Sequence, residues 1–169
     1  MTAKAWSQEI LFSTTERGSE RWETPDALFK VLDDEFDFDL DAAADEKNAK
    51  VEKYIPKEED SLSVNWSERG SSVWLNPPYG RTLGQWLRKA YEEGRKGITV
   101  VVLIFARTDT QYWHNYAAKA DEIRFMKGRV HFKRADGHTG PATAPSAVLV
   151  FQGERQRPPK VSHVELPRK

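Results

Sequence analysis

The stretch from Ile98 to Phe105 most constrains the fold of this 169-residue chain, because every residue in it except Thr99 is apolar. A run of this length is typical of a strand buried on both faces, as in a parallel sheet covered by helices. Helical and strand-like patterns alternate along the chain around it. The sequence therefore predicts an α/β sandwich with the size of a single domain.

The remaining elements are expected from the spacing of their apolar residues. A helix is predicted to begin at Thr24-Pro25, with the threonine as N-cap and the proline as the first helical residue. Two further helices are expected around residues 86–91 and 112–120. Strands are expected at 36–41, 73–75, 123–125, 130–132 and 147–151.

The ends of the chain lack such periodicity. We expect a loose N-terminal arm at residues 1–20, one domain at 21–152, and a basic, irregular tail at 153–169, which is rich in proline near its start. No internal repeat and no domain linker is recognised between them.

Composition excludes several kinds of site. The chain has no cysteine, which rules out disulfides, thiolate zinc sites and a cysteine nucleophile. Its four histidines are scattered, without a partner at metal-ligand spacing, so no metal site is expected. There is no long apolar run and no signal-peptide pattern, which predicts a cytoplasmic protein that does not span a membrane (in a host cell, if a phage or prophage encodes it).

The charge is balanced overall, with 26 basic and 26 acidic residues, but it is unevenly distributed. Residues 26–60 hold 13 acids and 5 lysines, a balance of about −8, whereas basic residues dominate from Arg81 onward. This asymmetry favours an anionic partner on the basic side. A solvated surface of mixed charge would explain it equally well.

Polar residues follow three of the expected strands, at the positions where open parallel sheets bind ligands. Asp39 and Asp41 end the first strand, and Asn76-Pro77-Pro78-Tyr79 follows the second. Arg107-Thr108-Asp109 follows Phe105. These strand ends are therefore the candidate functional site.

The tetrapeptide Asn76-Pro77-Pro78-Tyr79 is the strongest candidate for chemistry. Because two consecutive prolines fix the backbone, the amide oxygen of Asn76 and the carbonyl of Pro77 can bind both hydrogens of one amino group. Two such acceptors favour a pyramidal nitrogen with a free lone pair, which could attack a methyl donor. Tyr79 offers an aromatic face to a flat ring. A simple turn is the alternative, and the apolar strand before the loop argues against it.

Asp39 and Asp41 could accept hydrogen bonds from ribose hydroxyls or a cationic amine, both of which S-adenosylmethionine offers. Asp60-Ser61 could serve the adenine end of the same cofactor. The alternative is that the two aspartates lie on the solvent-exposed face of an edge strand, and their spacing alone favours this alternative. Ala42-Ala43-Ala44 stands where a glycine-rich loop would be expected, so dinucleotide binding has no support from motif.

Residues 124–134 interleave basic and aromatic side chains, a combination that suits phosphate and base contacts. Gly128 predicts a tight turn that presents Arg129. A basic hairpin exposed to solvent is the alternative interpretation. The segment comprises Arg124, Lys127, Arg129, His131, Lys133 and Arg134, with Phe125 and Phe132 between them.

Together these segments resemble the phage-type DNA N-6-adenine methyltransferases, a compact branch related to the DNA adenine methylases. The matching order extends over roughly residues 22–151. The segments that carry the resemblance are Trp22-Glu23-Thr24-Pro25, Leu28-Phe29, Phe36 to Ala44, Asn48-Ala49-Lys50, Asp60-Ser61-Leu62, Val73 to Gly80, Trp86 to Ala90, Arg107 to Thr110, Arg124-Phe125, Lys127-Gly128-Arg129 and Pro145 to Val148.

The resemblance implies a Rossmann-like fold with a mostly parallel sheet, S-adenosylmethionine as methyl donor, and adenine in double-stranded DNA as acceptor. It implies that Asn76 and the Pro77 carbonyl hold the amino group while Tyr79 stacks on a flipped base. The cofactor-binding residues expected on this basis are Trp22, Thr24, Pro25, Asp39, Asp41, Ala42, Asp60, Ser61 and Asn76, with the Thr24-Pro25 segment closing over the cofactor. The residues expected to contact DNA are Arg81, Arg107, Asp109, Arg124, Lys127, Arg129 and Lys133.

A chain of this length has no room for a large separate target-recognition domain. Reading of the DNA sequence would come from residues 110–145, from the tail, or from a second subunit in a homodimer. Two rival functions remain at this point. One is a methyltransferase for another planar amino group, on glutamine in a protein or on an RNA base, and the other is a DNA-binding relative that has lost catalysis.

Overall fold

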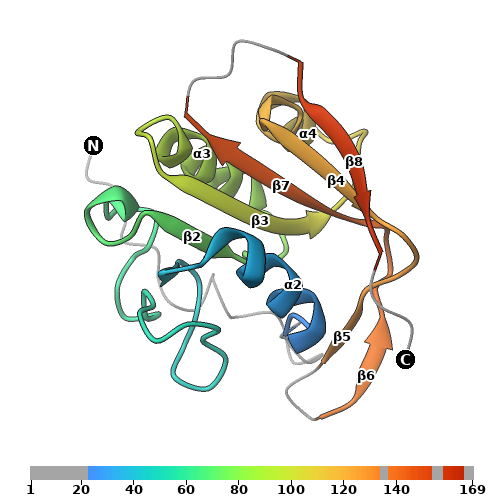
Figure 1. Ribbon diagram of the computed structural model, residues 1–169, viewed down its shortest axis with the longest axis horizontal. Coiled ribbons are helices and arrows are strands. Elements are labelled where there is room, and N and C mark those ends of the chain that lie inside the picture. Colours follow the sequence, from blue (N-terminus) through green and yellow to red (C-terminus); the bar gives the residue numbers. More distant parts are fainter. Residues whose placement is uncertain (1–22, 134–136, 154–157, 166–169) are drawn as a thin grey trace.

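The computed structural model describes residues 23–133, 137–153 and 158–165 (Figure 1). The expected arm at 1–20, Trp22, Arg134 and the tail residues 154–157 and 166–169 lie outside this described part. The described elements, in chain order, are α2 (Asp26–Phe36), β1 (Leu40–Asp41), the 3-10 helix η1 (Trp66–Glu68), β2 (Ser72–Leu75), α3 (Leu83–Gly94), β3 (Thr99–Phe105), α4 (Gln111–Asn115), the 3-10 helix η2 (Ala117–Lys119), β4 (Glu122–Met126), β5 (His131–Lys133), β6 (Thr139–Pro141), β7 (Ser146–Gln152) and β8 (Lys160–Val164).

The main sheet has six strands in the order β1-β2-β3-β7-β4-β8, and β5 and β6 form a separate two-stranded hairpin. β1, β2 and β3 are parallel, as are β4 and β8, whereas β7 runs antiparallel to both of its neighbours. The predicted α/β architecture is confirmed, with a mixed and mostly parallel sheet that is consistent with a Rossmann-like methyltransferase fold.

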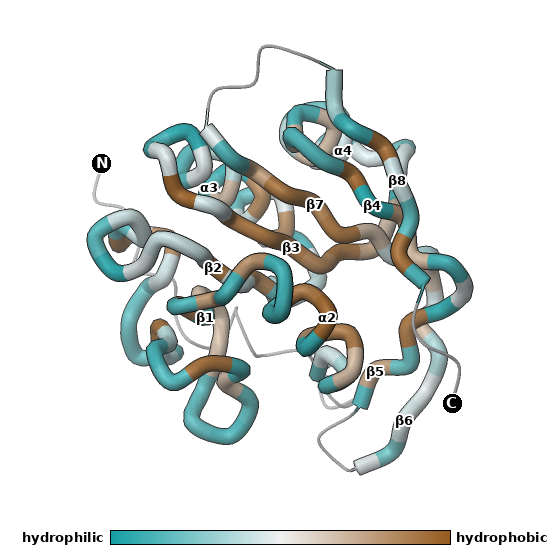
Figure 2. Tube along the Cα trace, viewed as in Figure 1, coloured by the Kyte–Doolittle hydropathy of each residue, from teal (hydrophilic) through white to brown (hydrophobic). Residues whose placement is uncertain are grey.

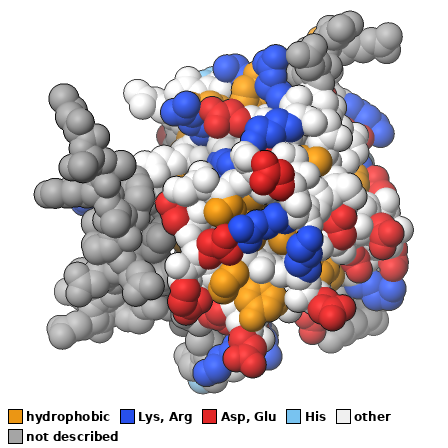
Figure 3. Space-filling model, turned by 90° about the vertical axis from the view of Figure 1, so that its left-hand side faces the viewer, with side chains coloured by type: hydrophobic (Ala, Val, Ile, Leu, Met, Phe, Trp, Pro, Cys, Tyr) orange, Lys and Arg blue, Asp and Glu red, His pale blue; other side chains and the backbone are white. Residues whose placement is uncertain are grey.

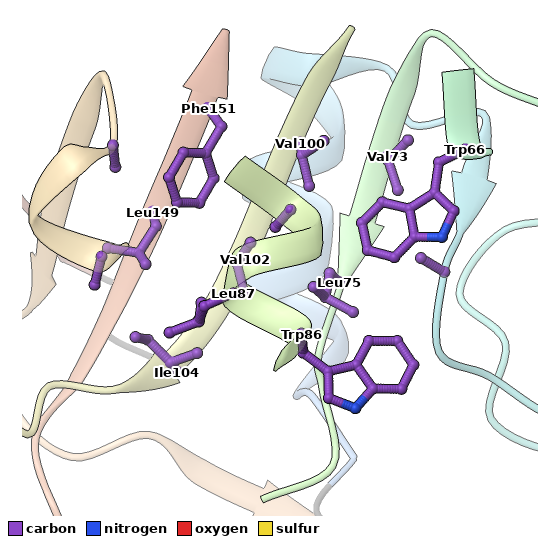
Figure 4. Close-up of a cluster of buried hydrophobic side chains, with 14 of the residues drawn as sticks. Trp66, Val73, Leu75, Trp86, Leu87, Val100, Val102, Ile104, Leu149 and Phe151 are labelled. Carbon is purple, nitrogen blue, oxygen red and sulfur yellow. The ribbon is translucent and has the colours of Figure 1, made fainter. Parts of the chain in front are cut away.

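β3 lies inside this sheet, paired with β2 on one side and with β7 along its whole length. Its residues from Val100 to Phe105 are buried, as predicted for a strand covered on both faces. On one face, Trp86 and Leu87 of α3 pack over side chains of β2 and β3, among them Leu75 and Val102 (Figure 4).

The other face of the sheet is covered by α2 (Figure 1), and Val130, Phe132 and Ala142 of the hairpin region complete the same core. Leu28, Phe29 and Leu32 of α2 pack against Trp74 of β2 and alternate residues of β3. Burial of each such side chain contributes about 1.5–3 kcal/mol. The apolar strands β3 and β7 consequently lie in the interior, while the surrounding loops are hydrophilic (Figure 2).

The start of α2 differs from the expectation in one respect. Pro25 occupies the N-cap position, and its carbonyl accepts hydrogen bonds from the amides of Leu28 and Phe29, both at 3.0 Å. Thr24 is buried and makes no capping bond, so its prediction as N-cap is wrong. The proline carbonyl provides the first helical acceptor in place of the threonine side chain.

The strand predicted over residues 36–41 is mostly absent. Phe36 ends α2, and Asp37 turns the chain in a left-handed conformation with φ of 50°, which leaves only Leu40–Asp41 as β1. Phe36 and Phe38 nevertheless stack at 5.9 Å, and Phe38 also contacts Trp74 at 5.5 Å. The alternation of Phe36 and Phe38 with aspartates therefore comes from the end of a helix and the turn after it, whose two aromatic rings pack together.

Two elements of the back half also differ from the expectation. The helix predicted at 112–120 is divided into α4 and η2. Residues 160–164 form the edge strand β8, paired in parallel with β4, so the expectation of an irregular tail is wrong there. A short edge strand with mostly exposed side chains has no apolar period that could have revealed it.

Candidate active site

The carboxyl ends of β1, β2 and β3 meet at one edge of the sheet, because these strands are parallel. β4 ends at the same edge, since β3 and β4 both pair antiparallel with β7. The β5–β6 hairpin, which follows β4, extends from that edge (Figure 1). Asp41, the Asn76 loop, Arg107 and the hairpin are thus brought to one side of the molecule.

The Asn76-Pro77-Pro78-Tyr79 loop leaves β2 directly after buried Leu75. Pro77 is buried and Asn76 is half-buried, with its Oδ1 atom inaccessible to solvent. Tyr79 is half-buried, and its ring stacks on Phe105 with 4.4 Å between ring centroids and 28° between ring planes. Its hydroxyl donates to the Leu103 carbonyl at 3.4 Å. Burial, with a smaller effect of Tyr112, raises the pKa of Tyr79 well above its usual value, so the phenol is neutral.

Asp41 ends β1 as a buried carboxylate. Its Oδ1 accepts the amide of Ala43 at 3.2 Å, and its Oδ2 accepts the amide of Lys50 at 3.1 Å. Burial raises the pKa of Asp41 to about 6, although these backbone bonds favour the ionised form. Asp41 therefore shapes the loop at 42–50, and its raised pKa means that it gains or loses a proton just below neutral pH.

Asp39 lies two residues earlier, at the amino end of the neighbouring β2. Its exposed carboxylate accepts the Ser71 amide at 2.9 Å, the Ser71 hydroxyl at 2.8 Å and the Ser72 amide at 3.0 Å. The structure thus places Asp39 away from the edge that carries Asn76 and gives it a structural role. Its expected cofactor contact is not supported, because these bonds fix the entry into β2.

Ser61 and Ala42 are brought together behind β1. The Ser61 hydroxyl donates to the Ala42 carbonyl at 2.6 Å, and the indole of Trp66 donates to the Ser61 carbonyl at 2.9 Å. Asp60 is exposed, and its carboxylate accepts the Leu62 amide at 3.1 Å and the Ser63 hydroxyl at 2.5 Å. Ser61 thus holds the loop at 60–63 against the residue that follows β1, while Asp60 closes that loop on itself.

The start of α2 and the residues just before it connect the loop at 42–50 with the hairpin. Asp26 forms an ion pair of 2.7 Å with Lys50, and Glu23 exchanges backbone hydrogen bonds of 2.8 and 3.2 Å with Lys133. Between them, the buried Thr24 hydroxyl has no hydrogen-bond partner among the described residues. This segment includes Thr24-Pro25, which the family resemblance implies would close over the cofactor.

Arg124 differs most from its predicted role in DNA contact. Its guanidinium forms two bonds to Glu35 of α2, at 2.6 and 2.7 Å, and a further bond of 2.9 Å to Glu122. It also lies over the ring of Phe36, at 5.1 Å from the centroid. These acidic partners raise its pKa. Arg124 joins β4 to α2 and is not available to a phosphate.

The other residues predicted to contact DNA are exposed: Arg81, Arg107, Asp109, Lys127, Arg129 and Lys133. Lys127 pairs with Glu165 at 2.9 Å, and the guanidinium of Arg107 lies 6.0 Å from the Phe105 ring centroid. Gly128 has a φ of 80°, as a tight turn before Arg129 requires. By contrast, the face at the amino ends of β2 and β3 interleaves basic and acidic side chains (Figure 3).

Sequence reasoning missed two residues at this edge. Phe105 appeared only as the last apolar residue of a buried strand, yet it supports Tyr79. Ser146, opposite Phe105 on β7, is buried with a hydroxyl that has no hydrogen-bond partner among the described residues. The available signal for Ser146 was a polar residue at the start of an apolar run, directly after Pro145.

Within the described part, no cluster of three metal-ligating side chains occurs, and no helix is long and apolar enough to cross a membrane.

Comparison with known proteins adds an independent finding. The family model described as DNA N-6-adenine-methyltransferase (Dam) matches residues 12–168. A DNA N-6-adenine-methyltransferase of Haemophilus phage HP1 is 29% identical over 147 residues, which cover 83% of each chain. Another of Escherichia phage T1 is 32% identical over 107 residues, covering 63% of this chain and 44% of the relative.

Proposed function

The chain belongs to the DNA N-6-adenine-methyltransferase (Dam) family, and on this premise we propose that it methylates N6 of an adenine flipped out of DNA at the Asn76-Pro77-Pro78-Tyr79 loop. The single observation that carries the proposal is the position of this loop. It leaves a buried parallel strand at the sheet edge where folds of this type bind their ligands, beside the stacked rings of Tyr79 and Phe105.

The side chains at the edge suit S-adenosylmethionine, which when bound supplies an electrophilic methyl group on a cationic sulfur. Asp41 places a buried carboxylate beside the loop at 42–50, where it can accept a hydrogen bond or attract a positive charge. Thr24 contributes a buried hydroxyl with no partner in the described part of the chain. An orphaned polar atom of this kind fits a ligand contact, since leaving it unbonded costs about 1–3 kcal/mol.

Asn76 and the Pro77 carbonyl would bind the two hydrogens of the adenine amino group. The nitrogen lone pair is delocalised into the ring, and two fixed acceptors favour a pyramidal nitrogen whose lone pair is free. With S-adenosylmethionine bound, N6 would form the new N–C bond while the bond between methyl and sulfur breaks, and N6 would release one proton to water. Because the two prolines fix the backbone, the acceptors would not have to move during this step.

Tyr79 would hold the flipped base by stacking. One face of its ring is covered by Phe105, and the neutral phenol presents no charge to the adenine. Exposed cations at the same edge, Arg107, Arg129 and Lys133, would bind the phosphates on either side. This combination favours nucleic acid over a protein glutamine as the acceptor.

A methylation assay with a labelled donor tests the proposal on three substrates: unmethylated DNA, RNA and protein. We expect label in DNA alone, recovered as N6-methyladenine. Label recovered only in RNA or protein would support the rival methyltransferase, and no transfer together with retained DNA binding would support a relative that has lost catalysis.

A further inference from the structure

We propose that Phe105 and Phe132 are positioning residues which, with Tyr79, form an aromatic column that couples the β5–β6 hairpin to the catalytic loop. The inference rests on the proposed function, because it assigns to Tyr79 the stacking of a flipped base. It adds the claim that contact between DNA and the hairpin sets the geometry of that stack.

The first contact of the column fixes Tyr79. With Phe105 stacked at 4.4 Å on one face of the ring, only the opposite face is left for a base. The hydroxyl bond to the Leu103 carbonyl limits rotation of the ring in its own plane. Tyr79 would therefore receive the base as the third layer of a stack whose lower layer is Phe105.

The second contact fixes Phe105 from the side of the hairpin. The edge of one ring meets the face of the other, with 6.2 Å between the centroids of Phe105 and Phe132 and 79° between the ring planes. Phe132 is fully buried, and Phe105 is nearly so. A displaced Phe132 would leave a void beside Phe105, which a close-packed core does not tolerate without movement.

Phe132 occupies the middle of the three-residue strand β5. Its neighbours His131 and Lys133 are exposed, because successive side chains of a strand point to opposite faces. The same short strand thus presents the Lys133 ammonium to solvent and the Phe132 ring to the core. A phosphate held by Lys133 would restrain the strand that seats Phe132.

The hairpin is also attached through Val130 and Ala142, which are buried in the same core cluster as Phe132. The Ala142 amide bonds the Val130 carbonyl at 2.7 Å and closes the base of the hairpin itself, whereas Glu23 bonds the backbone of Lys133 and ties the hairpin to another segment. The latter contact reaches the segment that carries Thr24. DNA bound at the hairpin would therefore act on two neighbouring parts of the site, and the aromatic column is its direct route to Tyr79.

Phe132→Leu tests the column, with Phe29→Leu as the matched control. Phe29 is a buried ring of the same core that contacts Phe38 at 5.7 Å and Trp74 at 5.5 Å. The single-turnover methylation rate of Phe132→Leu should fall about tenfold, the effect of losing one aromatic pair. The KM for S-adenosylmethionine should not change. Phe29→Leu should leave the rate within about twofold, whatever its thermal stability.

A double-mutant cycle distinguishes positioning from general damage. In a Tyr79→Ala background, Phe132→Leu should lower the remaining rate by less than about twofold, since its effect passes through the missing ring. A full tenfold loss in that background, or equal losses in Phe132→Leu and Phe29→Leu, would overturn the inference. If Phe132→Leu does not fold, Phe132→Met applies the same test with a side chain that fills more of the space.

The failure of the two proposals can be told apart. A wild-type protein that transfers no methyl group to adenine in DNA contradicts the proposed function itself. An active wild-type protein whose Phe132 variants behave as the Phe29 control contradicts only the aromatic column.

Discussion

Arg124 and Glu35 are 89 residues apart in the sequence, and two hydrogen bonds of 2.6 and 2.7 Å join their side chains. The pair connects the middle of β4 to the last turn of α2, with the guanidinium lying over Phe36. Because α2 begins and β4 ends at the edge that carries the Asn76 loop, this bond helps to fix the two elements that frame the site.

Arg124→Ala should therefore lower stability without altering DNA contact. We expect the free energy of unfolding to fall by about 2 kcal/mol, less than for a fully buried pair because Glu35 is 49% exposed. The salt dependence of DNA binding should remain as in the wild type. Lys127→Ala, which breaks an exposed pair with Glu165, is the control and should cost less than about 1 kcal/mol. An Arg124→Ala protein of normal stability with a shallower salt slope would contradict this assignment.

Arg129→Ala should show the opposite behaviour. Arg129 is exposed after the turn at Gly128, so we expect normal stability and weaker DNA binding. If it meets one phosphate, the slope of log K against log salt should decrease by about 0.9. Arg88→Ala, at an exposed arginine of α3, provides the control in a binding titration at several salt concentrations. An unchanged slope in Arg129→Ala would show that Arg129 does not contact a DNA phosphate.

Arg124 and Arg129 illustrate what the sequence could and could not predict. Local pattern identified β3 and the Asn76 loop, because apolar runs and paired prolines act through their immediate neighbours. Local pattern assigned Arg124 to DNA contact because Glu35, the acidic partner of Arg124, lies 89 residues away and leaves no trace in the neighbouring sequence. The same limit applies to Phe105, whose stacking on Tyr79 depends on the pairing of β2 with β3.

Asp39 and Asp41 show a second limit. Their spacing predicts one shared role, but Asp39 precedes the two-residue strand β1 and bonds Ser71, whereas Asp41 ends it and bonds Lys50. The sequence could not separate them because the αL turn at Asp37 is made by a residue other than glycine, and it shortens the strand from its beginning.

Asp41 should give stability a recognisable dependence on pH. Folding raises its pKa from 3.8 to about 6, so the folded state binds more protons in this interval, and stability is lost as the pH rises through it. Relative to the wild type, the free energy of unfolding of Asp41→Asn should therefore increase by up to about 3 kcal/mol between acidic and neutral pH. Urea titrations across this range measure the difference.

Asp39→Asn is the control for this measurement. The hydrogen bonds from Ser71 and Ser72 outweigh burial and lower the pKa of Asp39, so its contribution is lost only as the pH falls below the ordinary carboxyl value. The free energy of unfolding of Asp39→Asn relative to the wild type should therefore be constant from the ordinary carboxyl pKa up to neutral pH. A constant difference for Asp41→Asn as well would contradict the raised pKa.

Tyr79 should act through its ring and not through its hydroxyl. The bond to the Leu103 carbonyl is long, at 3.4 Å, so Tyr79→Phe should keep the methylation rate within about threefold. Tyr79→Ala removes the stack, which is worth about 1–3 kcal/mol for a base, and should lower the rate by about tenfold or more. Equal losses in both variants, measured under single-turnover conditions, would assign the role to the hydroxyl.

The most direct test of the account is the yield of N6-methyladenine in unmethylated DNA incubated with S-adenosylmethionine and either the wild-type protein or Asn76→Ala. Removing one of the two acceptors should lower the rate by about a hundredfold or more, as for the loss of one preorganised group at a developing charge. The fold, followed by circular dichroism, should be retained. A folded Asn76→Ala protein that methylates adenine at the wild-type rate would contradict the central claim.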